Sequence, residues 1–189
     1  MATAPRKTAA RKAPAKKTSA AARTDAIALL RADHKRVSEL FEQYESARSA
    51  ARKKTIVATI CQELSLHAQV EEEIFYPAVK AALKDKELVP EAQVEHASLK
   101  ELIAQVKDKE PDGEMFDAKI KVLSEYTKHH VKEEHNEMFP RARKTRLDMA
   151  ELGERIAARK QALKDDPSQM QPPSPSALAQ VDETAASAA

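Results

Sequence analysis

Two stretches of this chain share one pattern of a histidine, a glutamate and an aromatic–proline pair. The first is HAQVEEEIFYP, from His67 to Pro77, and the second is HHVKEEHNEMFP, from His129 to Pro140. Aligned on His67 and His130, both place a glutamate four residues later, an aromatic residue nine later and a proline ten later. Residues four apart lie on one face of an α-helix, about 6 Å apart. The repeat therefore predicts two helices that each present an imidazole beside a carboxylate.

Apolar residues at alternating spacings of three and four predict four amphipathic helices over residues 25–141. The expected helices cover about residues 25–46, 49–76, 89–106 and 116–140. Pro77 and Pro140 are expected to end or kink the second and fourth helices, because proline lacks an N–H and crowds the preceding turn. Short turns between four helices predict an all-α fold, an up-down-up-down four-helix bundle.

The segments outside this bundle have weaker patterns. Residues 142–164 retain some apolar periodicity and predict an accessory C-terminal helix. Residues 1–24 contain nothing apolar larger than Ala after Met1, and residues 165–189 include the run PPSPS, so both tails are expected to be disordered. No apolar run approaches the ~20 residues that span a bilayer, and a single cysteine fits a reducing compartment. We therefore expect a cytoplasmic protein without membrane contact.

Charge is distributed unevenly along the chain. The formal net charge is +2, but residues 1–24 carry seven Lys or Arg and no acid, so the remainder sums to −5. One hypothesis is that residues 6–23 form a polycationic arm that contacts nucleic acid phosphates without sequence preference. The alternatives are a solubilising tail and a mitochondrial transit peptide, although the apolar face of a transit helix is missing.

Each of the four predicted helices carries one histidine in its apolar stripe: His34, His67, His96 and His130. The spacing between the first two is 33 residues and between the last two 34, and each follows a large apolar residue by seven positions. The first and third helices also match, with D-H-x-x-x-x-E-L from Asp33 and E-H-x-x-x-x-E-L from Glu95. The pattern indicates two helix hairpins related by a pseudo-two-fold axis, with all four imidazoles pointing inward.

Glu71 and Glu134 share the inner face with these histidines. A buried carboxylate is costly unless it is paired, and the stripes contain no Lys or Arg to neutralise it. Four imidazole nitrogens and four carboxylate oxygens are too many ligands for one tetrahedral zinc ion. They suit two metal ions bridged by Glu71 and Glu134, each ion with two histidines and, beside a bridging oxide or hydroxide, about one open position. Iron is the expected metal, and manganese is the second choice.

These motifs resemble the hemerythrin family, specifically the bacterial proteins with HHE cation-binding domains. The resemblance covers about residues 25–141, and it rests on the six residues His34, His67, Glu71, His96, His130 and Glu134 together with the aromatic–proline pairs. It implies a non-haem di-iron site with these six residues as ligands. The oxygen-carrying hemerythrins have a further histidine four residues after the one on the third helix, where this chain has Lys100. That departure argues against simple reversible oxygen carriage.

The resemblance implies a protein that binds or reacts with oxygen, nitric oxide or peroxide at an open iron position. The alternative is a non-enzymatic iron store or sensor, tethered to DNA by the basic arm. One ligand has an alternative as well, since the family's older pattern places the carboxylate five residues after the histidine, as Glu134 follows His129. The repeat favours His130. The remaining charged residues of the two motifs are assigned to outer positions: Glu72, Glu73, Glu133, Glu137 and His135. Tyr76 and Phe139 are assigned to core packing, and Lys100 is assigned to a solvated face.

Overall fold

The computed structural model describes residues 25–84 and 86–171, and within these ranges the secondary structure is helical, with no strand. This confirms the predicted all-α fold. None of the described helices combines the length and apolar character that a bilayer crossing requires. The predicted disordered segments 1–24 and 172–189 lie outside the described residues.

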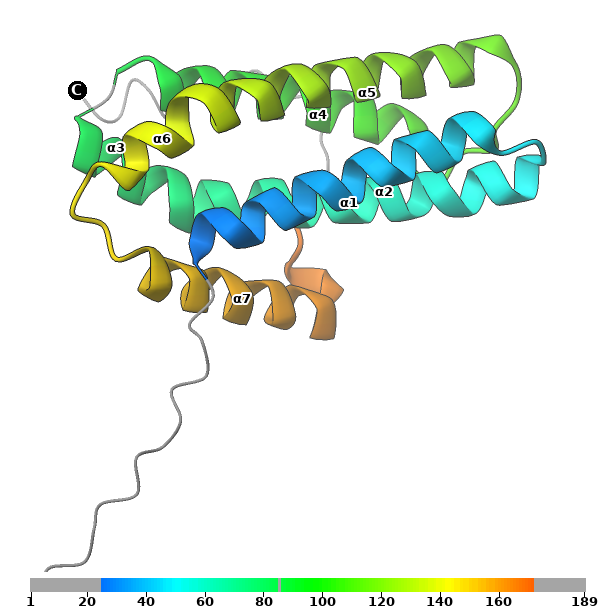
Figure 1. Ribbon diagram of the computed structural model, residues 1–189. Helices are drawn as coiled ribbons and strands as arrows, with labels where there is room; N and C mark the ends of the chain where they lie inside the picture. Colours follow the sequence, from blue (N-terminus) through cyan, green and yellow to red (C-terminus); the bar gives the residue numbers. More distant parts are fainter. Residues whose placement is uncertain (1–24, 85, 172–189) are drawn as a thin grey trace, which may run out of the picture.

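Four helical rods run side by side and the chain turns back at alternate ends of the bundle (Figure 1). The helices of these rods are α1 Ala26–Ser46, α2 Ala50–Val70, α3 Tyr76–Leu83, α4 Leu88–Val106, α5 Glu114–Glu133 and α6 Phe139–Arg143. Side chains cap the first two helices, where Asp25 accepts a hydrogen bond from the N–H of Ala28 and Ser49 accepts one from the N–H of Arg52. Such caps satisfy backbone donors that have no partner within the helix.

The second and fourth rods continue past Pro77 and Pro140, so the prolines do not end them as the sequence pattern allowed. Each rod contains a π-helical turn directly before its proline: η1 Glu71–Phe75 and η2 Glu134–Met138. In these turns backbone hydrogen bonds reach back five residues instead of four. Each proline then lies in the first turn of the following α-helix, where its missing N–H costs nothing.

The core has two apolar clusters, one towards each end of the bundle. One contains Leu30, Val70 and Met138, and the other contains Val37 and Leu123. The four stripe histidines fall between residues of the two clusters along each helix, as His34 does between Leu30 and Val37. Apolar layers above and below therefore separate the imidazoles from solvent.

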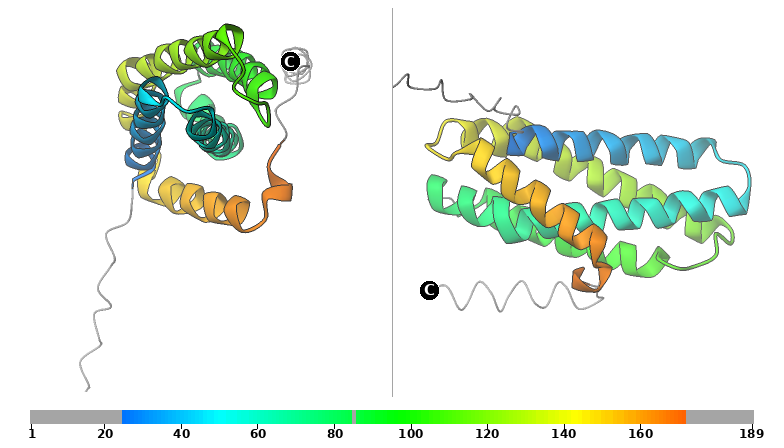
Figure 2. Two further views of the ribbon diagram at one scale, coloured as in Figure 1. Left: turned by 90° about the vertical axis from the view of Figure 1, so that its right-hand side faces the viewer. Right: turned by 90° about the horizontal axis from the view of Figure 1, so that it is seen from below.

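Helix α7, Met149–Asp165, lies outside the four rods and crosses α1 and α2 (Figure 2). Its buried Leu152, Ile156 and Leu163 join the apolar cluster that contains Leu66 and Val70 of α2. Figure 2 shows the helix at an angle to the bundle axis, as expected for an accessory element. A 3₁₀ turn, η3 Pro167–Gln169, follows α7 where the sequence pattern predicts disorder. The reason is a pair of hydrogen bonds with the side chain of Gln69, which donates to the carbonyl of Gln169 and accepts from the N–H of Gln171.

Candidate metal centre

The structure brings the six predicted ligands together in one buried layer of the bundle. Each of the six is less than a tenth exposed: His34, His67, Glu71, His96, His130 and Glu134. The histidines come from α1, α2, α4 and α5, and the two glutamates are the first residues of the π-turns η1 and η2. The π-turns thus begin at the carboxylates, a location typical of π-bulges at functional sites.

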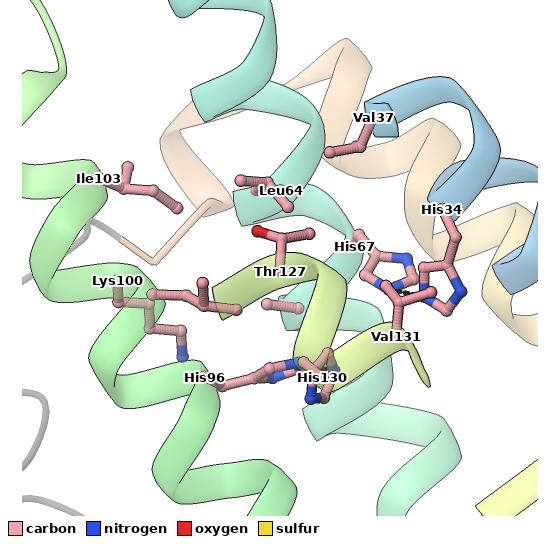
Figure 3. Close-up of a pocket in the computed structure, with 12 residues that line it drawn as sticks. His34, Val37, Leu64, His67, His96, Lys100, Ile103, Thr127, His130 and Val131 are labelled. Atoms are coloured by element: carbon pink, nitrogen blue, oxygen red, sulfur yellow. Dashed lines mark hydrogen bonds between the residues drawn. The ribbon is translucent and has the colours of Figure 1, made fainter. Parts of the chain in front are cut away.

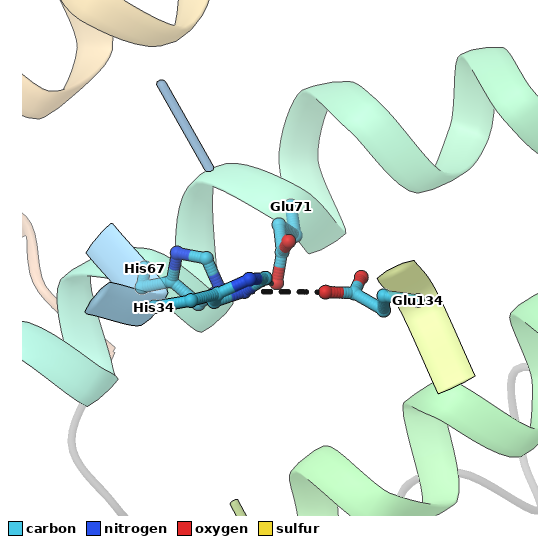
Figure 4. Close-up of side chains that lie close together, drawn as sticks. All are labelled: His34, His67, Glu71 and Glu134. Carbon is cyan, nitrogen blue, oxygen red and sulfur yellow. Dashed lines mark hydrogen bonds and ion pairs between the residues drawn. The ribbon is translucent and has the colours of Figure 1, made fainter. Parts of the chain in front are cut away.

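One half of the layer contains His34 and His67. Their Nε2 atoms lie 2.8 Å apart, Nε2 of His67 lies 3.1 Å from Oε2 of Glu71, and Nε2 of His34 lies 3.2 Å from Oε2 of Glu134 (Figure 4). Each of these four residues offers one potential ligand atom, and the four atoms lie within 4.8 Å of one another. This arrangement can hold one cation.

The other half contains His96 and His130, whose Nε2 atoms lie 3.1 Å apart. Nε2 of His96 is 3.5 Å from Oε2 of Glu71, and Nε2 of His130 is 3.8 Å from Oε2 of Glu134. Both carboxylates therefore reach both pairs of imidazoles. The layer thus contains buried histidine and glutamate clusters that could hold metal cations.

Two carboxylate oxygens of the layer lack hydrogen bonds in the described part of the protein. They are Oε1 of Glu71 and Oε2 of Glu134, although the latter lies in ion-pair distance of His34. A buried acceptor without a donor costs about 1–3 kcal/mol, and more when it is charged. A bound cation is a partner that offsets such a cost for a buried carboxylate, so the donor set fits a metal centre.

Burial and mutual repulsion shape the proton affinities of the layer. Burial lowers the pKa of His34 to about 4, and it lowers that of His96 to about 4. Burial also opposes a charged His67, but attraction from Glu71 and a hydrogen bond to Asp33 outweigh it and raise its pKa to about 10. Burial and repulsion from Glu134 raise the pKa of Glu71 to about 7. The first two imidazoles are thus ready to coordinate, whereas His67 must lose a proton first.

The outer ring nitrogens of all four histidines have partners that the sequence analysis did not assign to the site. Nδ1 of His67 donates to Asp33 at 3.2 Å, that of His96 to Glu72 at 3.0 Å and that of His130 to Glu95 at 2.7 Å, and Nδ1 of His34 lies 2.9 Å from Nε2 of His135. Such partners fix the ring orientation and leave Nε2 free for a metal. The expectation of purely outer positions for Glu72 and His135 is therefore wrong. The sequence repeat did contain a signal for two of these partners, because Asp33 and Glu95 directly precede the histidines of α1 and α4.

Two lysines hold these outer carboxylates in turn. Nζ of Lys100 lies 2.6 Å from Oε2 of Glu72, and Lys160 of α7 forms an ion pair with Asp33. Lys100 is largely shielded and lies near His96 rather than on a solvated face (Figure 3). Where the oxygen carriers have a further histidine, this chain therefore has a cation that anchors Glu72.

Tyr76 has a polar role in addition to the expected core packing. Its hydroxyl lies 3.0 Å from Oε1 of Glu134, 3.3 Å from Oε2 of Glu71 and 3.2 Å from Nε2 of His96. The residue is completely buried. Phe139, its counterpart in the repeat, stacks on the ring of His34 with 6.0 Å between centroids. The layer is thus polar beside one pair of imidazoles and apolar beside the other.

The structure places the two neighbouring histidines of α5 on opposite sides. The side chain of His130 is 3% exposed and faces the layer, whereas that of His129 is 64% exposed and faces outward. His129 is therefore not brought to the buried site.

Comparison with known proteins assigns the chain to a family. The sequence profile of the Hemerythrin HHE cation binding domain matches residues 25–142. The chain belongs to the hemerythrin HHE family. The family is defined by cation binding, and this chain presents buried histidine and glutamate clusters that can hold a metal.

Two individual proteins are also similar to this HHE protein. A crystal structure of a hemerythrin HHE cation binding domain-containing protein from Mycobacterium kansasii has a TM-score of 0.65 at 21% identity, covering 84% of this chain and 99% of that one. A protein from Nostoc sp. strain PCC 7120 named DNA nickase is 26% identical over 111 residues, which is 59% of this chain. The chain spans 31% of that protein's length. The similarity to the structure from Mycobacterium kansasii supports the helical fold of this chain.

Proposed function

We propose that the buried layer binds two iron ions and that the loaded protein binds or reacts with a small ligand such as oxygen, nitric oxide or peroxide. The observation that carries this proposal is the bridging position of two carboxylates between two pairs of imidazole nitrogens. His34 and His67 would hold one ion and His96 and His130 the other, with Glu71 and Glu134 shared. When bound, the irons would supply the ligand affinity and the electrons. Imidazole and carboxylate ligands favour iron, with manganese as the alternative.

A small cavity beside the layer supports a small ligand. It has a volume of about 20 Å³ and reaches all four stripe histidines, and Figure 3 shows Val37, Leu64 and Ile103 around it. A single water needs about 10–15 Å³, so a diatomic molecule or peroxide fits whereas an organic substrate does not. The surrounding apolar side chains would keep other water away from the site.

Tyr76 would act on the ligand through its hydroxyl. The hydroxyl is the one phenolic group within hydrogen-bond distance of both shared carboxylates in the described structure. Burial, followed by repulsion from Glu134 and Glu71, raises its pKa well above the ordinary value, so it remains protonated and can donate a hydrogen bond. It would donate near His96 and His130, which makes the two halves of the layer chemically different.

The small-ligand proposal is tested by narrowing the cavity without touching a ligand residue. Val131 borders the cavity from α5 and is only partly buried, so a larger side chain can be accommodated there. In Val131→Phe we expect the wild-type iron content but about tenfold slower reaction with nitric oxide or peroxide in stopped-flow mixing, while Val131→Ala retains the wild-type rate. Equal rates in all three proteins would show that ligands do not use this cavity.

A second function concerns nucleic acid. The relative from Nostoc is named a DNA nickase, and residues 6–23 of this chain carry seven Lys or Arg without an acid. We propose that this arm tethers a cytoplasmic iron-binding or iron-sensing bundle to DNA through phosphate contacts. Deleting residues 1–23 should abolish a gel shift that weakens steeply with salt, and a variant with the seven basic residues replaced by Gln should behave like the deletion. A shift that survives both changes contradicts the tether.

A further inference from the structure

The segment HHVKEEH contains two overlapping H-x-x-x-E pairs, and the buried centre uses one of them. His130 and Glu134 face inward, while His129 and Glu133 form the same pair one residue earlier, on the outer side of α5. Nε2 of His129 lies 3.1 Å from Oε1 of Glu133 and 3.4 Å from Oε1 of Glu95 on α4. An imidazole and two carboxylates from two helices thus converge at the surface, close enough to share one cation.

This outer cluster departs from the internal repeat. In the alignment of the two halves, His129 and Glu133 correspond to Leu66 and Val70 of α2. Both of those residues are buried in the apolar cluster to which α7 contributes. The second half of the bundle has ligand-type side chains where the first half has aliphatic ones, so symmetry does not account for them.

The outer cluster is connected to the buried centre in two ways. Glu95 uses Oε1 towards His129 and Oε2 towards Nδ1 of His130, at 2.7 Å. A gap of about 10 Å³ is bordered by Glu95 and Glu133 on the outside and by His130 and Glu134 on the inside. Glu134, on the inner side of the gap, is one of the two carboxylates of the buried centre.

The charge around this gap favours a cation. Glu91 also borders it, and Glu133 experiences the charges of Glu91, Glu95 and Glu137. Crowded carboxylates raise the local concentration of divalent cations. A cation moving inward would exchange Glu133 for its neighbour Glu134 and His129 for its neighbour His130.

We propose that Glu95, His129 and Glu133 form an outer divalent-cation site through which metal reaches the buried centre. One imidazole and two carboxylates suit Fe²⁺, Mn²⁺ or Zn²⁺, with water completing the coordination. The site is separate from the six buried ligands. Its role in loading rests on the proposed function, because that proposal supplies the destination of the metal.

Binding at the outer site is tested with Zn²⁺ on protein whose buried centre is already loaded. Calorimetric titration should find one further Zn²⁺ per chain in the wild type and at least tenfold weaker binding in His129→Ala. Glu114→Gln is the matched control, because Glu114 is exposed in the first turn of the same helix, fifteen residues before His129. Identical Zn²⁺ binding in His129→Ala and wild type would overturn the proposal.

Loading is tested by the rate at which the apoprotein takes up Fe²⁺. We expect His129→Ala to reach the wild-type iron content several-fold more slowly, and Glu114→Gln to load at the wild-type rate. An unchanged uptake rate in His129→Ala would refute the loading role. A wild-type chain that ends with fewer than two irons contradicts the proposed function instead, and the Zn²⁺ titration still decides whether the outer site exists.

Discussion

Each histidine of the buried layer is held at both ring nitrogens. Nε2 faces the shared carboxylates, and Nδ1 is fixed by Asp33, Glu72, Glu95 or His135. Three of these four partners are carboxylates, which increase the basicity of the imidazole as well as orienting it. His135 is the exception, so the ring of His34 is held by a weaker acceptor than the other three.

Replacing Glu72 should therefore weaken metal binding without removing a ligand. We expect Glu72→Ala to reduce metal affinity by about 10–100-fold, the usual effect of losing such a partner. Glu73→Ala is the control, because Glu73 is the next residue but pairs with Arg159 of α7 instead of a histidine. Competition with a coloured chelator measures both affinities, and equal losses in the two variants would show that the effect is not specific to His96.

The hydroxyl of Tyr76 provides a second residue-level prediction. Tyr76→Phe should keep the metal content of the wild type, because the six proposed ligands remain, but it should react about tenfold more slowly with peroxide, which corresponds to one hydrogen bond of about 1.4 kcal/mol. Tyr126→Phe is the control, since Tyr126 is exposed on α5. Stopped-flow absorbance gives both rates. A variant as fast as wild type would reduce Tyr76 to a packing role.

Metal binding should depend on pH through His67 and Glu71. Their pKa values are raised to about 10 and about 7, so at neutral pH the metal must displace protons from them. Because protons compete only below these pKa values, affinity should rise about tenfold per pH unit between about pH 6 and pH 8 through His67, and more steeply below about pH 7, where Glu71 also releases a proton. An indicator dye in weak buffer measures the release. Loading without proton release would contradict these proton affinities.

At the scale of helices, the π-turns explain how each carboxylate and the aromatic residue five positions later share the layer. The H-x-x-x-E spacing predicts the inward faces of His67 and Glu71, because His67 lies before the π-turn and Glu71 is its first residue. It does not predict the hydroxyl of Tyr76 beside Glu71, since the α-helical period assigns that ring to core packing. A regular α-helical period holds no information on where the backbone hydrogen bonds lengthen to a span of five residues.

Helix α7 stabilises the first half of the bundle. Ile156 is fully buried in the cluster with Leu66 and Val70, so Ile156→Ala should lower the free energy of unfolding by about 2–5 kcal/mol. Arg155→Ala, at the exposed neighbouring position, should change it by no more than about 0.5 kcal/mol. Urea denaturation followed by circular dichroism measures both. A loss below about 1 kcal/mol for Ile156→Ala would mean that α7 packs only loosely.

At the scale of the whole molecule, the pseudo-two-fold repeat predicts most of the fold and the inward direction of the six candidate ligands. Helical periodicity determines which residues share a face, so the sequence alone assigns His34 and His96 to the inner side of their helices. Contacts between helices, such as Asp33 with His67 or Lys160 with Asp33, depend on the rotation of one helix against another. Periodicity leaves that rotation open, and for this reason it does not predict which outer partner each histidine contacts.

The two halves of the molecule differ where the repeat is broken. Tyr76 stands against Phe139, Glu72 against His135, and the outer pair of His129 and Glu133 against Leu66 and Val70. These differences give the two halves of the layer unequal polarity, and His129 and Glu133 add ligand-type side chains to the outer face of the second half. The repeat therefore builds the centre, and its departures supply the features that would make the two metal positions distinct.

We propose that the six buried residues hold two irons. Metal analysis of the reconstituted protein, combined with an optical spectrum before and after dithionite and then oxygen, measures this. We expect two irons per chain and a near-ultraviolet absorption that dithionite removes and oxygen restores. One iron or none per chain, or a protein that remains colourless after reconstitution, would contradict it.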